Sequence, residues 1–224
     1  MSAGVSADVS ASDARGSLLV AAPLRIEAWA LRRGSVPSTR VLRSGMAPRR
    51  ARNAADLIAR DRTARAIAIA GFCGALTADL APGEIVVATE VRAPDGRSIA
   101  CDAPELLLEA LARRSMPARA GVLLSVDRIV GPRRRATLAA GEALAVDMES
   151  AWLAAGARGR PLAVLRAVVD GPGRELTRPL ATVRASLAAL RALRAGAGAL
   201  EEWSAAATAT LGDVDQPQLA DLRE

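Results

Sequence analysis

The sequence predicts a single α/β domain with a central, mixed but mostly parallel β-sheet that is flanked by helices. Short apolar runs typical of buried strands alternate with Ala-rich segments of about ten residues typical of helices, and this order of elements produces such a sheet. The length of 224 residues and the hydrophobic content of 51% fit one globular domain. We place that domain at residues 17–212, between a disordered leader at 1–16 and a frayed tail at 213–224.

The individual elements follow from the apolar runs and the turn residues that end them. Residues 17–22 form an apolar run that predicts a buried strand, and Pro23 opens a helical pattern because proline is favoured in a first helical turn. The remaining predicted elements are, in order, a strand at 39–44, a helix at 50–60, strands at 65–70 and 84–91, a helix at 104–114, a strand at 120–126, a helix at 134–140, a strand at 143–147, a helix at 149–157, a strand at 162–169 and one or two helices at 179–211.

Four places in this fold are candidates for a ligand site. In open α/β sheets, ligands bind at the carboxyl ends of the strands, so the residues that follow each strand are the ones to inspect. These are Glu27, Gly45, the stretch Gly71–Gly74 and the acidic residues around Asp147–Glu149 and Asp170.

The composition excludes several kinds of chemistry. The chain contains no His, which rules out Ser-His-Asp and Cys-His pairs and His-ligated zinc. All 30 basic residues are Arg, so a Schiff-base lysine and a Walker-A loop are also excluded. Cys73 and Cys101 are too far apart for a CxxC motif, and two thiols do not make a disulfide framework, which favours a reducing compartment. We expect no metal and no cofactor, with catalysis carried by carboxylates, Arg, hydroxyls, backbone amides or Cys.

The formal net charge of +6 raises the question of an anionic partner. Nucleic acid is disfavoured as a partner, because an aromatic content of 2% leaves almost no side chains on which bases could stack. Arg-rich stretches at 48–52 and 132–135 could still meet an anion or an acidic membrane surface. No apolar run approaches the roughly 20 residues of a transmembrane helix, and the start lacks a signal-peptide pattern, so we expect a soluble cytoplasmic protein.

The most informative stretch is Ala145–Ala151, where an apolar strand ends in Asp147 and Glu149. Either carboxylate could face the ligand crevice, or Glu149 could merely occupy a first helical turn that favours negative charge. Asp170 directly follows the apolar run 163–169 and precedes a Gly-Pro-Gly turn, so it is either a turn residue or a general acid in apolar surroundings. The residues alone leave both alternatives open.

Taken together, several segments resemble the nucleoside phosphorylase/nucleosidase superfamily, which includes purine nucleoside phosphorylases, methylthioadenosine/S-adenosylhomocysteine nucleosidases and futalosine hydrolases. The resemblance covers about residues 17–175 and implies that superfamily's three-layer sandwich. The matching pieces are Ser44-Gly45-Met46, Ala70-Gly71-Phe72-Cys73-Gly74-Ala75-Leu76, Leu80-Ala81-Pro82-Gly83-Glu84-Ile85-Val86, Ser125-Val126-Asp127-Arg128-Ile129-Val130, Ala145–Ser150 and Leu165–Asp170, in the superfamily's order.

The resemblance also implies roles for individual residues. Glu149 matches the glutamate that accepts hydrogen bonds from the ribose hydroxyls, and Met148 matches the residue that packs against the sugar. Asp170 matches the aspartate that donates a proton toward N7 of the purine, and Glu27 is the best match to the glutamate that activates water in the nucleosidases. The other implied substrate-binding residues are Gly45, Phe72, Cys73 and Gly74.

Water is favoured over phosphate as the attacking group. The superfamily's phosphorylases carry an Arg and a hydroxyl residue around the glycine loop, and the corresponding positions here, Ile69 and Phe72, cannot hold phosphate. Arg25, Arg49 or a neighbouring subunit remain alternative sources of charge. Val169 stands where the nucleosidases usually have Ser, and Phe72 replaces a small residue, so a specialised relative is favoured over a standard methylthioadenosine nucleosidase.

One such relative is the hopanoid-associated subgroup of this superfamily. The segment Arg174–Pro179 also resembles a motif of that subgroup. That resemblance implies release of adenine from an adenosylhopane-type lipid and peripheral contact with a membrane. The alternatives are a general purine nucleosidase, a phosphate-dependent phosphorylase and a non-catalytic nucleoside-binding member. In each case the partner is a small-molecule purine nucleoside, and the superfamily's habit implies a homo-oligomer.

Overall fold

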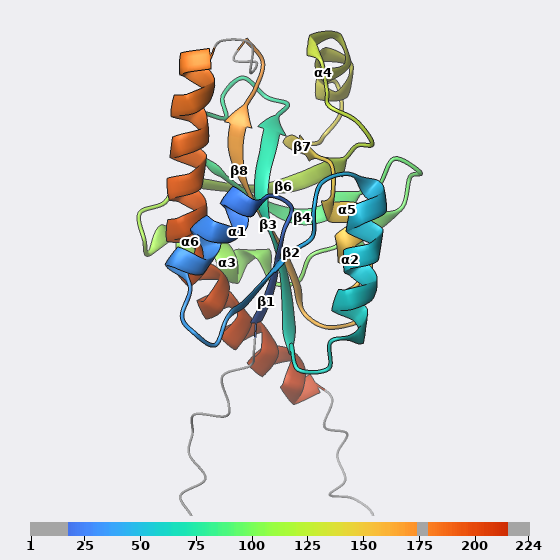
Figure 1. The fold of residues 1–224 in the computed structure, drawn as a ribbon, viewed down its shortest axis with the longest axis vertical. Coiled ribbons are helices and arrows are strands. Elements are labelled where there is room, and N and C mark those ends of the chain that lie inside the picture. The colour runs from blue at the N-terminus through green and yellow to red at the C-terminus, as the bar shows by residue number, and fades with distance from the viewer. Residues whose placement is uncertain (1–17, 174–178, 215–224) are drawn as a thin grey trace, which may run out of the picture.

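The computed structural model describes residues 18–173 and 179–214, and its centre is one eight-stranded mixed sheet (Figure 1). The main path of the sheet runs in the order β2-β1-β3-β7-β6-β4-β5, and β8 pairs with β3 and β4. The elements are β1 Leu18–Ala22, α1 Arg25–Gly34, β2 Arg40–Arg43, α2 Pro48–Arg60, β3 Ala66–Ala75, β4 Ile85–Arg92, β5 Ser98–Ala100, α3 Pro104–Ala112, β6 Ala118–Ser125, α4 Pro132–Ala139, β7 Ala145–Asp147, α5 Ser150–Ala154, β8 Leu162–Asp170 and α6 Pro179–Val214.

Most strand pairs are parallel, which confirms the predicted sheet type. β1 lies parallel to β2 and β3, β3 to β8, and β6 to both β4 and β7. The antiparallel pairs are β3 with β7, β4 with β5 and β4 with β8. As a result, β1, β3 and β8 run in the same direction and end at one edge of the sheet, where a ligand site is expected.

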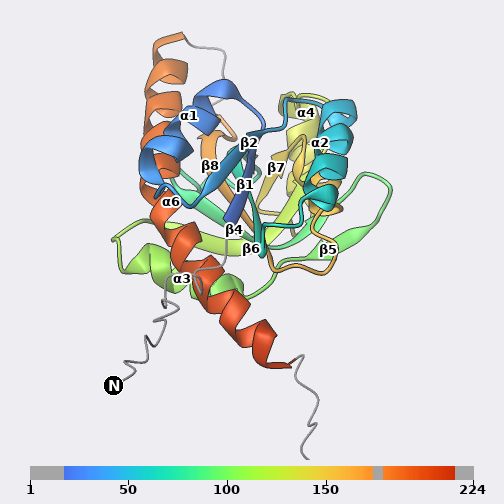
Figure 2. The ribbon, with the colours of Figure 1, turned by 60° about the horizontal axis from the view of Figure 1, so that its bottom comes forward.

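Helices cover both faces of the sheet, as Figure 2 shows. One apolar cluster joins α1, α3 and α6 to one face, and a second cluster joins α2 and α5 to the other. In the first cluster, Trp203 of α6 is fully buried and its indole N–H donates a hydrogen bond of 3.0 Å to the carbonyl oxygen of Asp102. None of the helices in the described ranges has an apolar stretch long enough to cross a membrane.

The structure differs from the sequence prediction at β3 and β5. β3 continues past Gly71 to Ala75 because it pairs with β8 along its whole second half, with a register shift between Cys73 and Gly74. β5 was not predicted, because its three residues contain no apolar run. They lie mostly exposed beside β4. The segment after β8 forms a single helix, α6, in agreement with the predicted one or two helices.

The predicted chain ends are described only in part. The leader at 1–16 lies outside the described residues, as does the tail at 213–224 except for its first two residues, which belong to α6.

The close packing of α1 on α6 gives a stability test at Gly34. A Cβ added there would lie 1.9 Å from the carbonyl oxygen of Arg194. We expect Gly34→Ala to lower the free energy of unfolding by about 1–3 kcal/mol, because the two backbones must separate. The control is Gly198→Ala in α6, whose added Cβ meets nothing closer than the Arg114 guanidinium at 3.4 Å. That variant should be as stable as the wild type or more so in urea unfolding, and equal losses in both variants would contradict this account.

Candidate active site

A cavity of about 220 Å³ lies at the carboxyl ends of β1, β3, β7 and β8. Its charged lining residues are four carboxylic acids and two arginines, and the rest of the lining is mostly apolar. The lining residues are Pro23, Leu24, Glu27, Met46, Phe72, Cys73, Gly74, Val126, Arg128, Ile129, Val130, Arg135, Val146, Asp147, Met148, Glu149, Val169 and Asp170. Segments far apart in the sequence therefore meet at the edge of the sheet where the strands end.

Glu27 lies in the first turn of α1 with its side chain turned toward β3. Its carboxylate accepts hydrogen bonds from the backbone N–H groups of Leu24, at 2.6 Å, and Phe72, at 2.7 Å. Burial raises the pKa of Glu27 above its usual value, although the charge of Arg166 and the two hydrogen bonds act in the opposite direction. A carboxylate with a raised pKa is a stronger base than an exposed one, so it can accept a proton from a ligand in the cavity.

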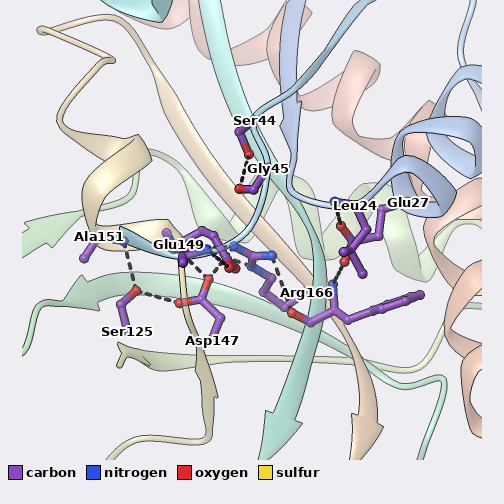
Figure 3. Close-up of polar contacts among 12 residues, drawn as sticks. Leu24, Glu27, Ser44, Gly45, Ser125, Asp147, Glu149, Ala151 and Arg166 are labelled. Carbon is purple, nitrogen blue, oxygen red and sulfur yellow. Dashed lines mark hydrogen bonds and ion pairs between the residues drawn. The ribbon is translucent and has the colours of Figure 1, made fainter. Parts of the chain in front are cut away.

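Arg166 of β8 is fully buried, and its guanidinium lies among the acidic residues of the site (Figure 3). Its guanidinium forms an ion pair with Asp147 and donates hydrogen bonds of 2.8 and 3.2 Å to Oγ of Ser150. Asp147 also accepts hydrogen bonds from Oγ of Ser125, at 2.6 Å, and from the backbone N–H of Ser150, at 3.0 Å. Burial opposes the charge of Arg166, but the carboxylates of Asp147, Glu149 and Glu27 together raise its pKa. Asp147 is thus held by three donors and has little capacity left for a ligand.

Glu149 occupies the N-cap position of α5 and is only 5% exposed. Burial raises the pKa of Glu149 to about 7, the charges of Asp147 and Glu27 act in the same direction, and Arg166 opposes them. Its Oε1 accepts one hydrogen bond, of 3.2 Å, from the backbone N–H of Ala47 in the turn before α2. The carboxylate therefore faces the cavity with acceptor capacity to spare, which suits hydrogen bonding to ligand hydroxyls.

Arg135 and Asp170 form a second group of charged side chains in the cavity, where Asp170 ends β8. Nη2 of Arg135, which comes from α4, lies 2.6 Å from Oδ2 of Asp170. Nη1 of Arg135 donates a hydrogen bond of 2.5 Å to the carbonyl oxygen of Ala75. Cys73, which precedes Gly74 on β3, is buried. This burial raises the pKa of its thiol, so the thiol stays neutral.

Two glycines of β3 set the distance between these charged groups. A Cβ on Gly71 would lie 2.6 Å from Nη1 of Arg166 and 2.9 Å from Oε1 of Glu27. A Cβ on Gly74 would lie 2.5 Å from Oδ1 of Asp170. Three residues of a strand rise about 10 Å, so the contacts of Gly71 and those of Gly74 are separated by about this distance along β3.

Of the eight residues chosen from the sequence, seven line this one cavity and Gly45 does not. Gly45 follows β2 with φ of 78°, and its neighbour Met46 reaches the cavity instead. The seven are Glu27, Phe72, Cys73, Gly74, Met148, Glu149 and Asp170. Arg25 and Arg49, considered from the sequence as sources of positive charge, are exposed and are not among the lining residues.

Sequence reasoning missed the two buried arginines of the site. Arg166 carried a usable signal, since it is the one charged residue within the apolar run 163–169 and a buried charge requires a partner. Arg135 carried none, because it stands in a run of three arginines of which the first is exposed and the second is half-buried.

Comparison with known proteins identifies the family to which this chain belongs. The family model described as "Phosphorylase superfamily" matches residues 18–201. The chain therefore belongs to the phosphorylase superfamily, the superfamily of nucleoside phosphorylases and nucleosidases that its motifs resemble. Among curated proteins, none matches this chain.

Solved structures share the fold at low sequence identity. Futalosine hydrolase of Helicobacter pylori is 17% identical with a TM-score of 0.69, and the match covers 85% of this chain and 98% of that one. The 5′-methylthioadenosine/S-adenosylhomocysteine nucleosidase of Campylobacter jejuni is 16% identical with a TM-score of 0.70, covering 84% and 99%. The nucleosidase of Neisseria meningitidis, in complex with methylthio-immucillin-A, is 21% identical with a TM-score of 0.67, covering 84% and 98%.

The buried cluster gives a stability test at Arg166. Replacing it in Arg166→Leu leaves Asp147 buried without its counter-charge, so we expect the free energy of unfolding to fall by about 3–5 kcal/mol in urea titrations. The matched control is Arg97→Leu, which removes an exposed ion pair with Asp95 and should cost less than about 1 kcal/mol. Similar losses in the two variants would show that Arg166 does not support the cluster.

The raised pKa of Glu149 predicts a pH dependence of stability. The usual pKa is 4.5 and the folded value is about 7, so between these pH values the folded state holds a proton that the unfolded state has released. The free energy of unfolding should therefore fall as pH rises through this window, and Glu27 contributes in the same direction.

Urea unfolding at both ends of this window measures the fall. It should be smaller in Glu149→Gln than in the wild type, whereas Glu109→Gln, at an exposed position on α3, should leave it unchanged. An identical fall in Glu149→Gln and the wild type would rule out Glu149 as its source.

Proposed function

We propose that this protein cleaves the N-glycosidic bond of a purine nucleoside with water and releases the free base. The observation that carries the proposal is the arrangement of carboxylic acids in one cavity. Glu27 and Glu149 lie at one end, beside the buried Arg166, and Asp170 lies at the other, about three strand residues away. A nucleoside that spans this distance has its sugar beside the glutamates and its base beside Asp170.

In this mechanism the carboxylic acids divide the work. Glu149 accepts hydrogen bonds from the ribose 2′- and 3′-hydroxyls, and Met148 packs against the sugar. Asp170 donates a proton to N7 of the purine, so the electron pair of the breaking C1′–N9 bond moves onto a neutral leaving group. Glu27 takes a proton from the attacking water as its oxygen bonds to C1′.

The charge balance of the cavity supports this chemistry. Cleavage passes through an oxocarbenium-like sugar that carries positive charge, and nearby carboxylates stabilise it. Glu27, Glu149 and Asp147 supply that negative charge, and Arg166 balances only part of it. Raised pKa values at Glu27 and Glu149 are the expected consequence of crowding these acids in a buried site.

The same balance favours water over phosphate as the attacking group. A phosphate dianion needs cationic donors, and each arginine of the site already pairs with a carboxylate. Arg166 pairs with Asp147, Arg135 with Asp170, and the exposed Arg128 with Asp127. The names of the similar structures, a futalosine hydrolase and methylthioadenosine/S-adenosylhomocysteine nucleosidases, also agree with hydrolysis.

For the substrate, we favour an adenine nucleoside with an apolar 5′ substituent, such as an adenosylated lipid of the adenosylhopane type. The support is the apolar part of the lining, in which Met46 is 48% exposed and Ile129 is 85% exposed. A large apolar group could cover both side chains. We also place the protein in the cytoplasm as a homo-oligomer, with a peripheral membrane contact if the substrate is lipid-linked.

Product analysis tests the proposal directly. Incubated with adenosine or 5′-methylthioadenosine in phosphate-free buffer, the protein should release free adenine, detectable by chromatography. A strict requirement for phosphate would identify a phosphorylase. Nucleoside binding without any product over a long incubation would identify a non-catalytic member.

Substitution of the acids tests their roles. Asp170→Asn and Glu27→Gln should each lower kcat by about 10²-fold or more, because each removes a proton-transfer group, while adenine still binds. Glu149→Gln should mainly raise KM for nucleosides. Glu142→Gln is the control, since its side chain is exposed and forms only a peripheral contact with Arg92. Near-normal turnover in Asp170→Asn would remove Asp170 from the mechanism.

A further inference from the structure

Asp170 is held by a buried arginine that comes from a separate helix. Arg135 is the only buried residue of α4, and its side chain is 4% exposed. In Figure 1, α4 stands at the end of the sheet where the cavity lies, outside the helical layers. Arg135 thus anchors α4 to the cavity wall through its contacts with Asp170 and Ala75.

The hydrogen bonding of Arg135 depends on Asp170. Nη2 bonds to Oδ2 of Asp170 and Nη1 bonds to the carbonyl oxygen of Ala75, whereas the buried Nε has no hydrogen-bond partner. The side chains of Asp170 and Arg135 both lie against Gly74. A Cβ added there would be 2.5 Å from Oδ1 of Asp170 and 2.9 Å from Nη1 of Arg135. A buried guanidinium is stable only with its counter-charge, so this pair favours an ionised Asp170.

This pairing conflicts with the role of a proton donor. A general acid must hold a proton before it can deliver one, and a guanidinium 2.6 Å from Oδ2 opposes that proton. The neutral Cys73 thiol on β3 does not offset the guanidinium. The other charged groups that face the cavity are Arg128, Glu27, Asp147 and Glu149.

We infer that Arg135 is a positioning residue that keeps Asp170 ionised in the empty site and gives up Oδ2 when a base binds, so that base binding and proton uptake by Asp170 are coupled. The inference rests on the proposed function. N7 of the purine is an acceptor, so it can bond to Oδ2 only when this oxygen carries a proton, and a protonated Oδ2 no longer pairs with the guanidinium. When the contact breaks, Asp170 takes one proton from solvent, and it passes this proton to N7 as the C1′–N9 bond breaks.

The pH profile of kcat/KM tests the coupling. The alkaline limb reports loss of the proton from the acid. In Arg135→Gln this limb should move to higher pH by about one to three units, because the cation that opposes protonation is gone. Arg135→Lys loses the paired hydrogen bonds to Asp170 and Ala75 but keeps a positive charge, so its limb should stay near that of the wild type. Limbs that coincide in wild type and Arg135→Gln would overturn the inference.

A double-mutant comparison separates this role from a structural one. If Arg135 acts through Asp170, Arg135→Gln should have no further effect on the pH dependence of adenine binding in the Asp170→Asn background. A purely structural Arg135 would instead weaken adenine binding equally in both backgrounds and leave its pH dependence unchanged.

A further measurement needs no change at Arg135, so it remains available if those variants fail to fold. Calorimetry of adenine binding in two buffers of different ionisation enthalpy should show uptake of about one proton near neutral pH by the wild type, and none by Asp170→Asn. Binding by the wild type without proton uptake would overturn the inference. Failure of the proposed function is distinct, since it appears as absence of base release while adenine binding and proton uptake persist.

Discussion

The site depends on one buried cation, the guanidinium of Arg166, which is surrounded by carboxylates. Its pair with Asp147 joins β8 to β7. The hydroxyl of Ser125 donates to Asp147, and the hydroxyl of Ser150 accepts hydrogen bonds from Arg166. Without that charge, Glu27 and Glu149 would hold their protons more strongly, because burial already raises the pKa of each carboxylate and Arg166 opposes this rise. The carboxylates of Asp147, Glu149 and Glu27 outnumber this one cation.

The two charged groups of the cavity use arginine in opposite ways. Arg166 is fully buried and supports acids that remain in place, with its donors directed to Asp147 and Ser150. Arg135 lies beside the cavity and is paired with Asp170, the acid to which the proposed mechanism assigns the proton for the leaving base. In a chain without His or Lys, arginine thus has both roles. Arg166 keeps its ion pair throughout, and Arg135 responds to a change in the charge of Asp170.

The fold could be predicted from local patterns, but the pairings within the site could not. Apolar runs and turn residues located every strand except β5, whose three residues are held by their neighbour β4 and carry no pattern of their own. Motif resemblance located Glu27, Glu149 and Asp170. The partners of these acids were out of reach, because the contact of Arg135 with Asp170 joins positions 35 residues apart and exists only once α4 is placed.

The backbone of β3 forms the floor of the cavity between its two charged ends. Glu27 and Arg166 approach the strand at Gly71, and Asp170 and Arg135 approach it at Gly74, in each case within the space that a methyl group would fill. A side chain at either glycine would therefore expel a charge rather than line the cavity. New substrate preferences in this scaffold must come from other lining side chains, such as Met46, Ile129 and Met148, while Gly71 and Gly74 stay glycine.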